Sequence, residues 1–397
     1  MIHQRYKVAL TLLADGTICR WMPNTEPEIM CRDTVSVMKV CSDTLTVAAL
    51  TTDGRFLIAF REAEVLEDRT TYVRQILGCD SSDILKDLYI YDCSIAINTD
   101  SKLSIIRMPP GMDTVVNDIT ELETSVYRIP SSINLISFDN GHGFLRTDDN
   151  CLYSMGSNWP YRLGTLYQPE AYKKLWMPNF DHTSSISEIV CGSTFSLFLM
   201  KNGCVYSEST AIGGPGHKCD GDYCLLKFPE GVRIAKIAVR YMLLMFVSIC
   251  GQCYYINLLH DRARVKPKGF IPVKLDALAG YFVENLFVCD EFIFVLHDGG
   301  KVCLLWLDLP GRTRQRLSPN QDGIISLQFF DDKCVVSITQ MDSLLYFVTS
   351  DGSVYYSNLD TIDFEPYKIP FFDSNPIAIE NHALGIRSAL SVLNHKD

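Results

Sequence analysis

Short apolar runs alternate with polar turns along the whole chain, and one type of turn recurs. In each copy the residue two places after the turn residue is apolar, and the residue three places after it is usually Tyr or Cys. The turn residues are Gly16, Gly54, Ser101, Asn150, Gly203, Gly251, Gly300 and Gly352. Glycine and asparagine supply the positive φ of a tight hairpin turn, and Asp or Asn commonly precedes them here. Each copy therefore predicts a β-hairpin.

The turns are separated by 38 to 53 residues, and strand-like apolar stretches fill the intervals. The clearest interval has one stretch at 186–192, a second at 195–199 and then a turn at 202–203. Both faces of the second stretch are apolar, which is typical of a strand covered on two sides. Repetition at this period, with strands and turns alone, predicts an all-β fold: a single β-propeller of four-stranded blades that spans residues 1–397.

Two segments, near 62–87 and 208–224, are longer than the repeat needs, and we expect them to be irregular insertions. Apolar residues in the first recur at a spacing that suits a helix, although an extra strand would also fit. Near the other end of the chain, residues 377–390 resemble the first strands of a further repeat. Pairing of this segment with the amino-terminal hairpin at 6–21 is expected to close the ring of blades and remove its free edges.

Two adjacent stretches carry a more specific pattern. Residues 153–164 fit Tyr-x-Trp-Gly-x-Asn-x-x-Gly-Gln-Leu-Gly, with Met, Tyr and Arg at the places of Trp, the second Gly and Gln. Residues 186–199 fit Val-x-x-Ile-Ala-Cys-Gly-x-x-His-Ser-Leu-Ala-Leu, with Phe195 in place of His. In both stretches the chain resembles the repeat of the regulator of chromosome condensation family. The resemblance implies seven blades, whereas the turns number eight, so eight blades is the alternative.

Composition describes an ordinary folded chain, with 47% hydrophobic and 21% charged residues. A net charge of −11 argues against non-specific binding to nucleic acid or to anionic membranes. We recognise neither a secretory signal nor a membrane-spanning run. Fifteen cysteines without such a signal are expected to be small buried hydrophobes in a reducing compartment. The expected location is therefore intracellular, in the cytoplasm or the nucleus.

No catalytic, cofactor or metal site emerges from the motifs. The Cys-x-x-Cys at 250–253 straddles a recurring turn, which favours a structural role over a redox dithiol. His217, Cys219 and Cys224 could contribute to a metal site, but a fourth ligand is not evident, and a loop with incidental cysteines is favoured. The Gly-rich run at 213–216 lacks the Lys-Ser/Thr that completes a phosphate-binding loop. We therefore expect a protein that is not an enzyme.

Charge placement gives the candidate site. Basic residues follow the sixth and seventh turns at nearly equal offsets: Arg262, Arg264, Lys266, Lys268, Arg312, Arg314 and Arg316. Acidic residues hold similar positions after the first two turns: Glu26, Glu28, Glu62, Glu64, Glu67 and Asp68. Equal offsets in equivalent repeats predict that these residues lie on one rim of the propeller, with a basic side and an acidic side. The alternative is that these loops are charged only for solubility. Alternate arginines on a strand point the same way and suit phosphate or carboxylate groups.

A rigid propeller without an internal site suggests a protein–protein interaction scaffold that binds its partner through loops on one rim. An acidic or phosphorylated protein would fit the basic residues. The family resemblance implies an alternative, guanine nucleotide exchange on a small GTPase. Founding members of that family also have a basic amino-terminal tail that engages DNA, whereas only Arg5 and Lys7 lie near the start here. Nucleic-acid contact through the strip from Arg262 to Arg316 is a weaker option.

Overall fold

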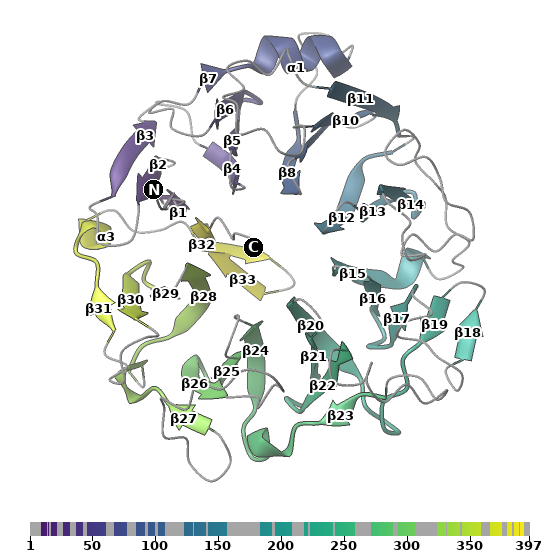
Figure 1. Cartoon of the computed structure of the whole chain (residues 1–397), viewed down its shortest axis with the longest axis vertical. Coiled ribbons are helices and arrows are strands. Elements are labelled where there is room, and N and C mark those ends of the chain that lie inside the picture. The colour runs from purple at the N-terminus through teal and green to yellow at the C-terminus, as the bar shows by residue number, and fades with distance from the viewer. Residues whose placement is uncertain are drawn as a thin grey trace, which may run out of the picture. The chain divides into compact units, whose positions relative to one another are not determined.

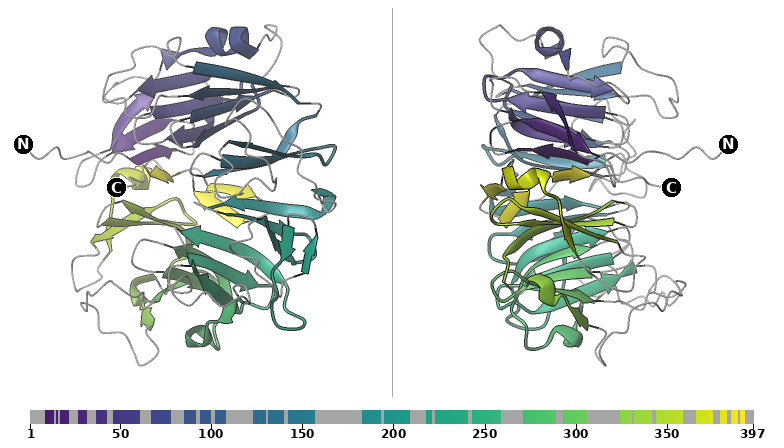
Figure 2. Two further views of the ribbon diagram at one scale, coloured as in Figure 1. Left: turned by 45° about the vertical axis from the view of Figure 1, so that its right-hand side comes forward. Right: turned by 90° about the vertical axis from the view of Figure 1, so that its left-hand side faces the viewer.

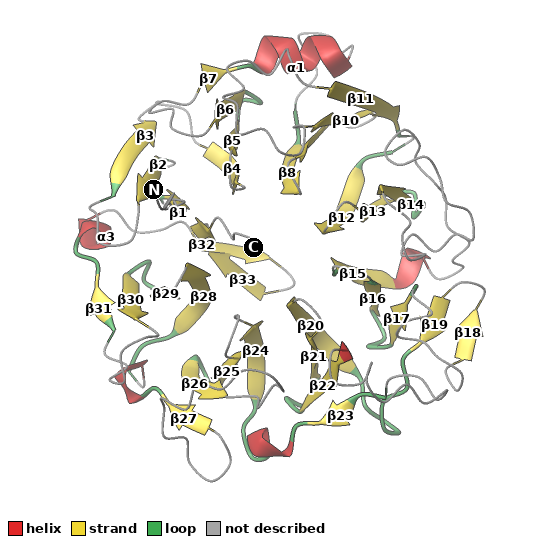
Figure 3. Ribbon diagram, in the orientation of Figure 1, coloured by secondary structure: helices red, strands yellow, loops and turns green. Residues whose placement is uncertain are grey.

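Strands account for nearly all of the structure, a computed structural model of the chain (Figure 3). The described residues run from 9 to 392 with internal breaks, several of which are short. The longer breaks are 61–66, 78–84, 108–122, 157–182, 209–217, 259–270, 306–323 and 359–365. The described chain divides into two compact units, residues 1–130 with 333–397 (unit 1) and residues 131–332 (unit 2).

We number the antiparallel sheets 1 to 8 in the order of the recurring turns, and unit 2 contains sheets 4 to 7 (Figures 1 and 2). Sheet 4 is β12 (Ile133–Asp139), β13 (His142–Thr147) and β14 (Leu152–Gly156). Sheet 5 is β15 (Ile186–Cys191), β16 (Ser196–Met200), β17 (Val205–Ser207), β19 (Tyr223–Leu225) and β18 (Lys218–Asp220). Sheet 6 is β20 (Ile234–Arg240), β21 (Leu243–Ser248), β22 (Cys253–Asn257) and β23 (Val273–Lys274). Sheet 7 is β24 (Val283–Val288), β25 (Ile293–His297), β26 (Lys301–Leu305) and β27 (Ile324–Ser326).

Unit 1 contains the other four sheets. Sheet 1 is β34 (Leu390–Val392), β1 (Ala9–Leu12), β2 (Ile18–Trp21) and β3 (Glu28–Cys31). Sheet 2 is β4 (Val37–Ser42), β5 (Thr46–Thr51), β6 (Phe56–Phe60) and β7 (Glu67–Asp68). Sheet 3 is β8 (Asp87–Tyr91), β9 (Ser94–Asn98), β10 (Lys102–Arg107) and β11 (Glu123–Arg128). Sheet 8 is β28 (Val335–Met341), β29 (Leu344–Thr349), β30 (Val354–Asn358) and β31 (Tyr367–Lys368). Helix α1 (Thr70–Leu77) lies against sheets 2 and 3, and the short helix α3 (Phe371–Ser374) follows sheet 8.

Every recurring turn joins the second and third strands of its sheet, so the sequence repeat corresponds to one sheet per turn. The described residues form eight sheets of three or more strands, and the seven blades implied by the family resemblance are not confirmed. The described turn residues have positive φ values between 65° and 95°: Gly54, Asn150, Gly203, Gly251, Gly300 and Gly352. Gly16 and Ser101 lie outside the described residues.

The two ends of the chain pair in sheet 1, as predicted. Strand β34 lies antiparallel to β1, with Thr11 opposite Leu390. Most of the expected segment takes another course, because β32 (Ile379–His382) and β33 (Gly385–Ser388) form a separate two-stranded sheet. Sheet 1 also packs against sheet 8 within unit 1, where Leu13 and Cys19 join one buried cluster with Tyr346 and Val348.

Strands in the middle of unit 2 are covered on both sides, which confirms the interpretation of residues 195–199. Leu197 and Leu199 of β16 pack with the apolar side chains of sheet 6. Phe198 points the other way and meets Phe144 of sheet 4 edge to face, at a centroid distance of 5.1 Å. Alternate residues of one strand therefore belong to two different cores, because successive side chains of a strand point to opposite faces.

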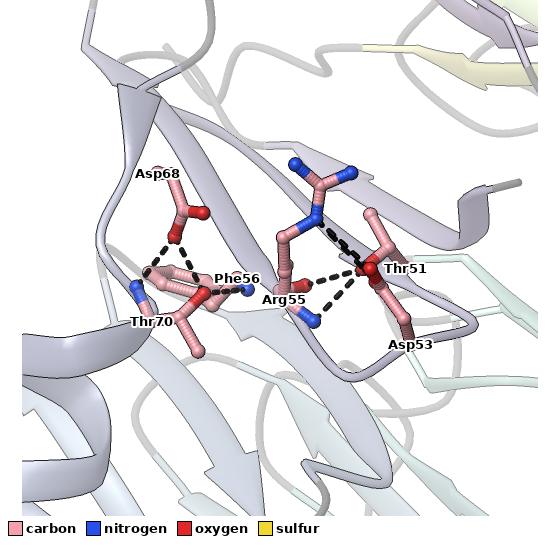
Figure 4. Close-up of polar contacts among 6 residues, drawn as sticks. All are labelled: Thr51, Asp53, Arg55, Phe56, Asp68 and Thr70. Atoms are coloured by element: carbon pink, nitrogen blue, oxygen red, sulfur yellow. Dashed lines mark hydrogen bonds and ion pairs between the residues drawn. The ribbon is translucent and has the colours of Figure 1, made fainter. Parts of the chain in front are cut away.

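The first insertion contains both a strand and a helix. Strand β7 completes sheet 2, and α1 follows it with Val73 fully buried. Asp68 accepts hydrogen bonds from the Thr70 N–H at 2.9 Å and from the Thr70 hydroxyl at 2.6 Å (Figure 4). That hydroxyl oxygen accepts the Phe56 N–H at 2.7 Å, which joins the start of the helix to sheet 2. Asp68, one of the residues expected on an acidic rim, is exposed and also has this local structural role.

Backbone hydrogen bonds fix each turn to the first strand of its own sheet. In sheets 4 to 8 the residue two places before the turn residue donates its N–H to the carbonyl just before the first strand. The pairs are Asp148 to Ser132, Lys201 to Ser185, Ile249 to Arg233, Asp298 to Phe282 and Ser350 to Cys334, at 2.7 to 3.2 Å. A β-bulge at the start of each of these first strands accompanies the contact.

Two turn glycines also contact the next sheet. The Gly203 carbonyl accepts the Ile234 N–H at 2.8 Å, and the Gly251 carbonyl accepts the Val283 N–H at 3.2 Å. A Cβ atom on Gly251 would lie 2.9 Å from the Val283 nitrogen and 2.8 Å from the Phe282 ring. Glycine is therefore required at Gly251 both by the left-handed backbone and by the closeness of the neighbouring sheet.

A side-chain cap recurs at three of the turns. The hydroxyl three places before the turn residue donates to the carboxylate one place before it, as in Thr51 to Asp53, Thr147 to Asp149 and Thr349 to Asp351 (Figure 4). The hydrogen bond from threonine is the main reason that the pKa of each of these aspartates lies below its ordinary value. The Thr-x-Asp spacing is visible in the sequence, where the aspartate alone indicated the turn.

We expect Gly251→Ala to destabilise the protein more than Gly231→Ala. Both glycines have positive φ, 75° and 80°, so alanine costs about 1–2 kcal/mol at either place. Only Gly251 has backbone atoms within contact distance of the added Cβ, whereas nothing lies within 4 Å at Gly231. The overlap adds about 1–3 kcal/mol. Urea unfolding of the two variants measures the difference, and equal midpoints would contradict the inter-sheet role of Gly251.

We expect Thr349→Val to raise the pKa of Asp351 toward its ordinary value. Because the folded-state pKa lies below the unfolded one, this carboxylate adds stability above the unfolded pKa and loses it as pH falls through the folded pKa. The side chain is solvent-exposed, so the variant should be less stable by roughly 0.5 kcal/mol near neutral pH, with the gap closing below about pH 4. Carbon-detected NMR titration of Asp351 and unfolding at two pH values test this; an unshifted pKa would refute the cap.

Candidate protein-interaction surface

The basic residues expected on the rim all lie outside the described residues: Arg262, Arg264, Lys266, Lys268, Arg312, Arg314 and Arg316. So do three of the acidic residues, Glu26, Glu62 and Glu64, and the side chain of Glu67. Glu28 is exposed in β3. The polarity of the rim stays a prediction.

The two cysteines of the Cys-x-x-Cys motif lie in different environments. Cys250 is exposed in its turn, and Cys253 is buried in β22, where burial raises the pKa of the thiol to about 12. Such a thiol is a poor nucleophile at neutral pH, which agrees with the structural interpretation. Cys224 is disulfide-bonded, so its sulfur is not a free ligand, and His217 lies outside the described residues. No group of three metal-binding side chains occurs among the residues described.

A Ser–His pair that the sequence did not indicate joins sheets 4 and 5. His142 Nε2 lies 3.0 Å from Ser196 Oγ, and the Ser196 N–H donates to the Glu208 carboxylate. His142 and Ser196 are fully buried, and Glu208 is 2% exposed. A nucleophile at this place has no open approach for a substrate. The three residues therefore act as a polar link between two sheets, and 54 residues separate the serine from the histidine.

In sheets 5, 6 and 7 a turn joins the second strand to the third. These three turns, together with Arg233 and Phe282, which precede the first strands of sheets 6 and 7, form one connected row that we call the turn row. It begins at the Gly203 turn, whose hypothetical Cβ would lie 2.7 Å from the Arg233 Cβ. Arg233 accepts the Ile249 N–H through its carbonyl at 2.9 Å. Ile249 precedes Gly251 by two residues, and the Phe282 ring lies against Gly251. Backbone contacts thus connect three sheets of unit 2 in a fixed order.

Two large apolar side chains of the turn row are exposed to solvent. Ile249 is 64% exposed and Phe282 is 51% exposed. Both residues have hydrogen-bonded backbone, and the Ile249 N–H donates to the Arg233 carbonyl at 2.9 Å. The Phe282 carbonyl accepts the Asp298 N–H at 3.2 Å, and the Phe282 N–H donates to the Asp298 carboxylate at 3.3 Å. Exposed apolar side chains in fixed positions are a feature of protein-binding surfaces.

Charge changes along the turn row. Lys201 and Arg233 are exposed at the sheet 5 end, which is therefore basic. Asp298 lies at the sheet 7 end, and a hydrogen bond from His297 Nδ1 at 3.0 Å is the main reason that its pKa is lowered. The His297 ring is 6% exposed and contacts Tyr281 edge to face at 4.7 Å. The apolar pair thus lies between a basic end and an acidic end.

The chemistry of the turn row suits recognition rather than catalysis. Its exposed residues include an aliphatic and an aromatic side chain, cations, and the Asp298 carboxylate, which is already hydrogen-bonded. An apolar group of a partner protein can be buried on such a surface while its charged neighbours meet the cations. None of the helices in the described part of the chain is long and apolar enough to cross a membrane.

No protein-family model matches this chain, and no curated protein matches it. Solved structures do match. Human WBSCR16 is 16% identical, with 78% of this chain and 87% of that chain covered at a TM-score of 0.51. Yeast RCC1 (Prp20), solved bound to Kap60, is 10% identical, with 84% and 86% covered at a TM-score of 0.51. BamB from Moraxella catarrhalis is 12% identical, with 87% and 90% covered at a TM-score of 0.48.

At these identities the likeness concerns the fold alone. It agrees with the series of antiparallel sheets described above. It also agrees with the resemblance carried by residues 153–164 and 186–199. The chain is an RCC1-like β-propeller.

Proposed function

We propose that this protein is a non-enzymatic protein–protein interaction scaffold that holds its partner on the turn row. The observation that carries the proposal is the exposure of Ile249 and Phe282, 64% and 51%, on hydrogen-bonded backbone. In keeping with the sequence prediction, we expect the scaffold to work in the cytoplasm or the nucleus.

Preorganisation supports the proposal. The backbone of both residues is hydrogen-bonded, Ile249 to Arg233 and Phe282 to Asp298, so binding orders few additional backbone residues. A surface of this kind loses less conformational entropy when a partner docks. An aromatic side chain at the centre of an interface is a common source of binding energy. Use of this fold for protein binding has a precedent in yeast RCC1, which was solved bound to Kap60.

The basic end of the turn row specifies the partner further. Arg233 lies beside Ile249, whose N–H its carbonyl accepts, and Lys201 lies in the Gly203 turn that Arg233 contacts. A partner with an apolar anchor flanked by carboxylate or phosphate groups therefore fits best. The same chemistry was predicted for the arginine row at 312–316. We propose that both surfaces favour acidic or phosphorylated segments.

We expect the double variant Ile249→Asp with Phe282→Asp to lose its partner. Two carboxylates would replace the apolar anchors, which should weaken capture at least about tenfold, since hot-spot residues each contribute about 2 kcal/mol or more. Quantitative affinity purification of tagged protein from cell extract measures the captured amounts. Val273→Asp is the matched control: Val273 is 53% exposed on β23, the outer strand of sheet 6, where it lies opposite Tyr255 and is not part of the turn row. Equal loss in the control, or none in the double variant, would contradict the proposal.

The arginine row gives a separate prediction. Reversing Arg312, Arg314 and Arg316 to Glu should abolish capture of an acidic partner and leave the melting temperature unchanged. Wild-type capture should also fall when salt rises from about 0.1 M to about 0.5 M, because exposed charge pairs are screened. Lys274→Glu, a reversal of an exposed lysine on β23, serves as the control. Unaltered capture by the triple variant would exclude the arginine row from the interface.

The same captures address the alternative of guanine nucleotide exchange. A small GTPase that is lost in the double variant would favour this alternative. Release of labelled GDP from the captured GTPase, accelerated by the purified chain, would then establish exchange and replace the scaffold proposal.

A further inference from the structure

Sheet 5 has five strands in the described part of the chain, whereas the other sheets numbered above have three or four. Its order is β15-β16-β17-β19-β18, so β19 takes the place of the fourth strand and β18 is an additional outer strand. Both come from the second predicted insertion. Strand β18 pairs with β19 alone, through three register positions from Lys218–Leu225 to Asp220–Tyr223.

The inner strand of this hairpin is firmly attached to the core. Tyr223 is fully buried, and its ring meets Phe198 edge to face at 5.4 Å. Cys224 is 4% exposed and lies opposite Ser207 of β17, while the Leu226 N–H donates to the Val205 carbonyl at 2.9 Å. These contacts do not involve β18, so β19 can keep its place without the outer strand.

Cys224 is disulfide-bonded, whereas eight other described cysteines are free thiols. The hairpin register sets Cys219 directly opposite Cys224 across β18 and β19. Directly opposed positions of an antiparallel pair come close enough for a disulfide. A bond between them would enclose only the four residues from 220 to 223. So short a loop restricts the unfolded chain little, and the bond would act on the hairpin more than on the whole fold.

We propose that the β18–β19 hairpin is a thiol-sensitive latch. In the oxidised state the disulfide of Cys224 holds β18 on the outer edge of sheet 5. In the reduced state β18 depends on three register pairs at a sheet edge and detaches, which uncovers the edge of β19. An uncovered edge presents unpaired N–H and C=O groups, to which a strand of another chain can add.

The reducing agent that fits is a small thiol of the glutathione class. One thiolate attacks a sulfur of the disulfide and forms a mixed disulfide, and a second thiol displaces it. The hairpin gains two thiols, and the two small thiols become one small disulfide. Local opening of a short edge strand gives the thiol access, since edges of this kind open at low free-energy cost.

Hydrogen–deuterium exchange of the full chain, with reduced and with oxidised glutathione, tests the latch. Reduction should accelerate exchange of the backbone amides at 218–220 at least about tenfold and leave the Leu226 amide unchanged, because Leu226 donates to the Val205 carbonyl of β17 and not to β18. Equal protection of 218–220 in the two buffers would overturn the proposal. A digest of the oxidised protein should join the peptide of Cys224 to that of Cys219, and a Cys224 thiol free to alkylate would also overturn it.

Cys224→Ser separates the latch from general thiol effects. Its 218–220 amides should exchange rapidly in either buffer. Cys253→Ser, which removes a buried free thiol from sheet 6, should respond to glutathione as the wild type does. If Cys224→Ser fails to fold, titration of the wild type with glutathione decides the matter alone. If the amides at 218–220 of Cys253→Ser no longer respond to glutathione, the response depends on a thiol outside the hairpin, and the latch is refuted.

Discussion

The backbone hydrogen bonds at the recurring turns are the contacts on which the rest of the structure depends. A left-handed residue turns the second strand into the third, and the residue two places before it bonds to the start of the first strand. At Gly203 and Gly251 the turn carbonyl also accepts an N–H from the next sheet. Because backbone atoms make these bonds, side chains elsewhere are free to vary. That freedom explains how the same fold persists at 10% to 16% identity to the RCC1-like structures.

Much of the fold could be predicted because its determinants are local in sequence. A turn glycine and an apolar residue two places later are close neighbours, so eight sheets could be counted from the turns. The alternation in 195–199 likewise indicated two buried faces. The links between sheets could not be predicted in this way. His142 and Ser196 meet across 54 residues, and nothing in either local sequence marks the other as its partner. The disulfide of Cys224 also needed the hairpin register before its setting was evident.

The candidate surface was harder to predict than the fold, and for a physical reason. Offsets counted from a turn locate a residue only while the chain follows a strand. The basic residues from Arg262 to Arg316 fall in segments outside the described residues. Ile249 and Phe282 carry no motif at all, since an exposed apolar residue looks the same in sequence as a buried one. Their significance comes from their position: the backbone of both residues is hydrogen-bonded, and their side chains are exposed to solvent.

Pairing of β1 with β34 has a consequence for how the protein is made. The first strand of sheet 1 is supplied by residues 390–392 and its neighbour by residues 9–12. The ribosome therefore releases the early strands long before their partner exists. During that interval β1 has an unsatisfied edge, and contacts of such long sequence separation form slowly. Synthesis of this chain thus leaves a nascent edge that chaperones are suited to shield until residues 390–392 have been made.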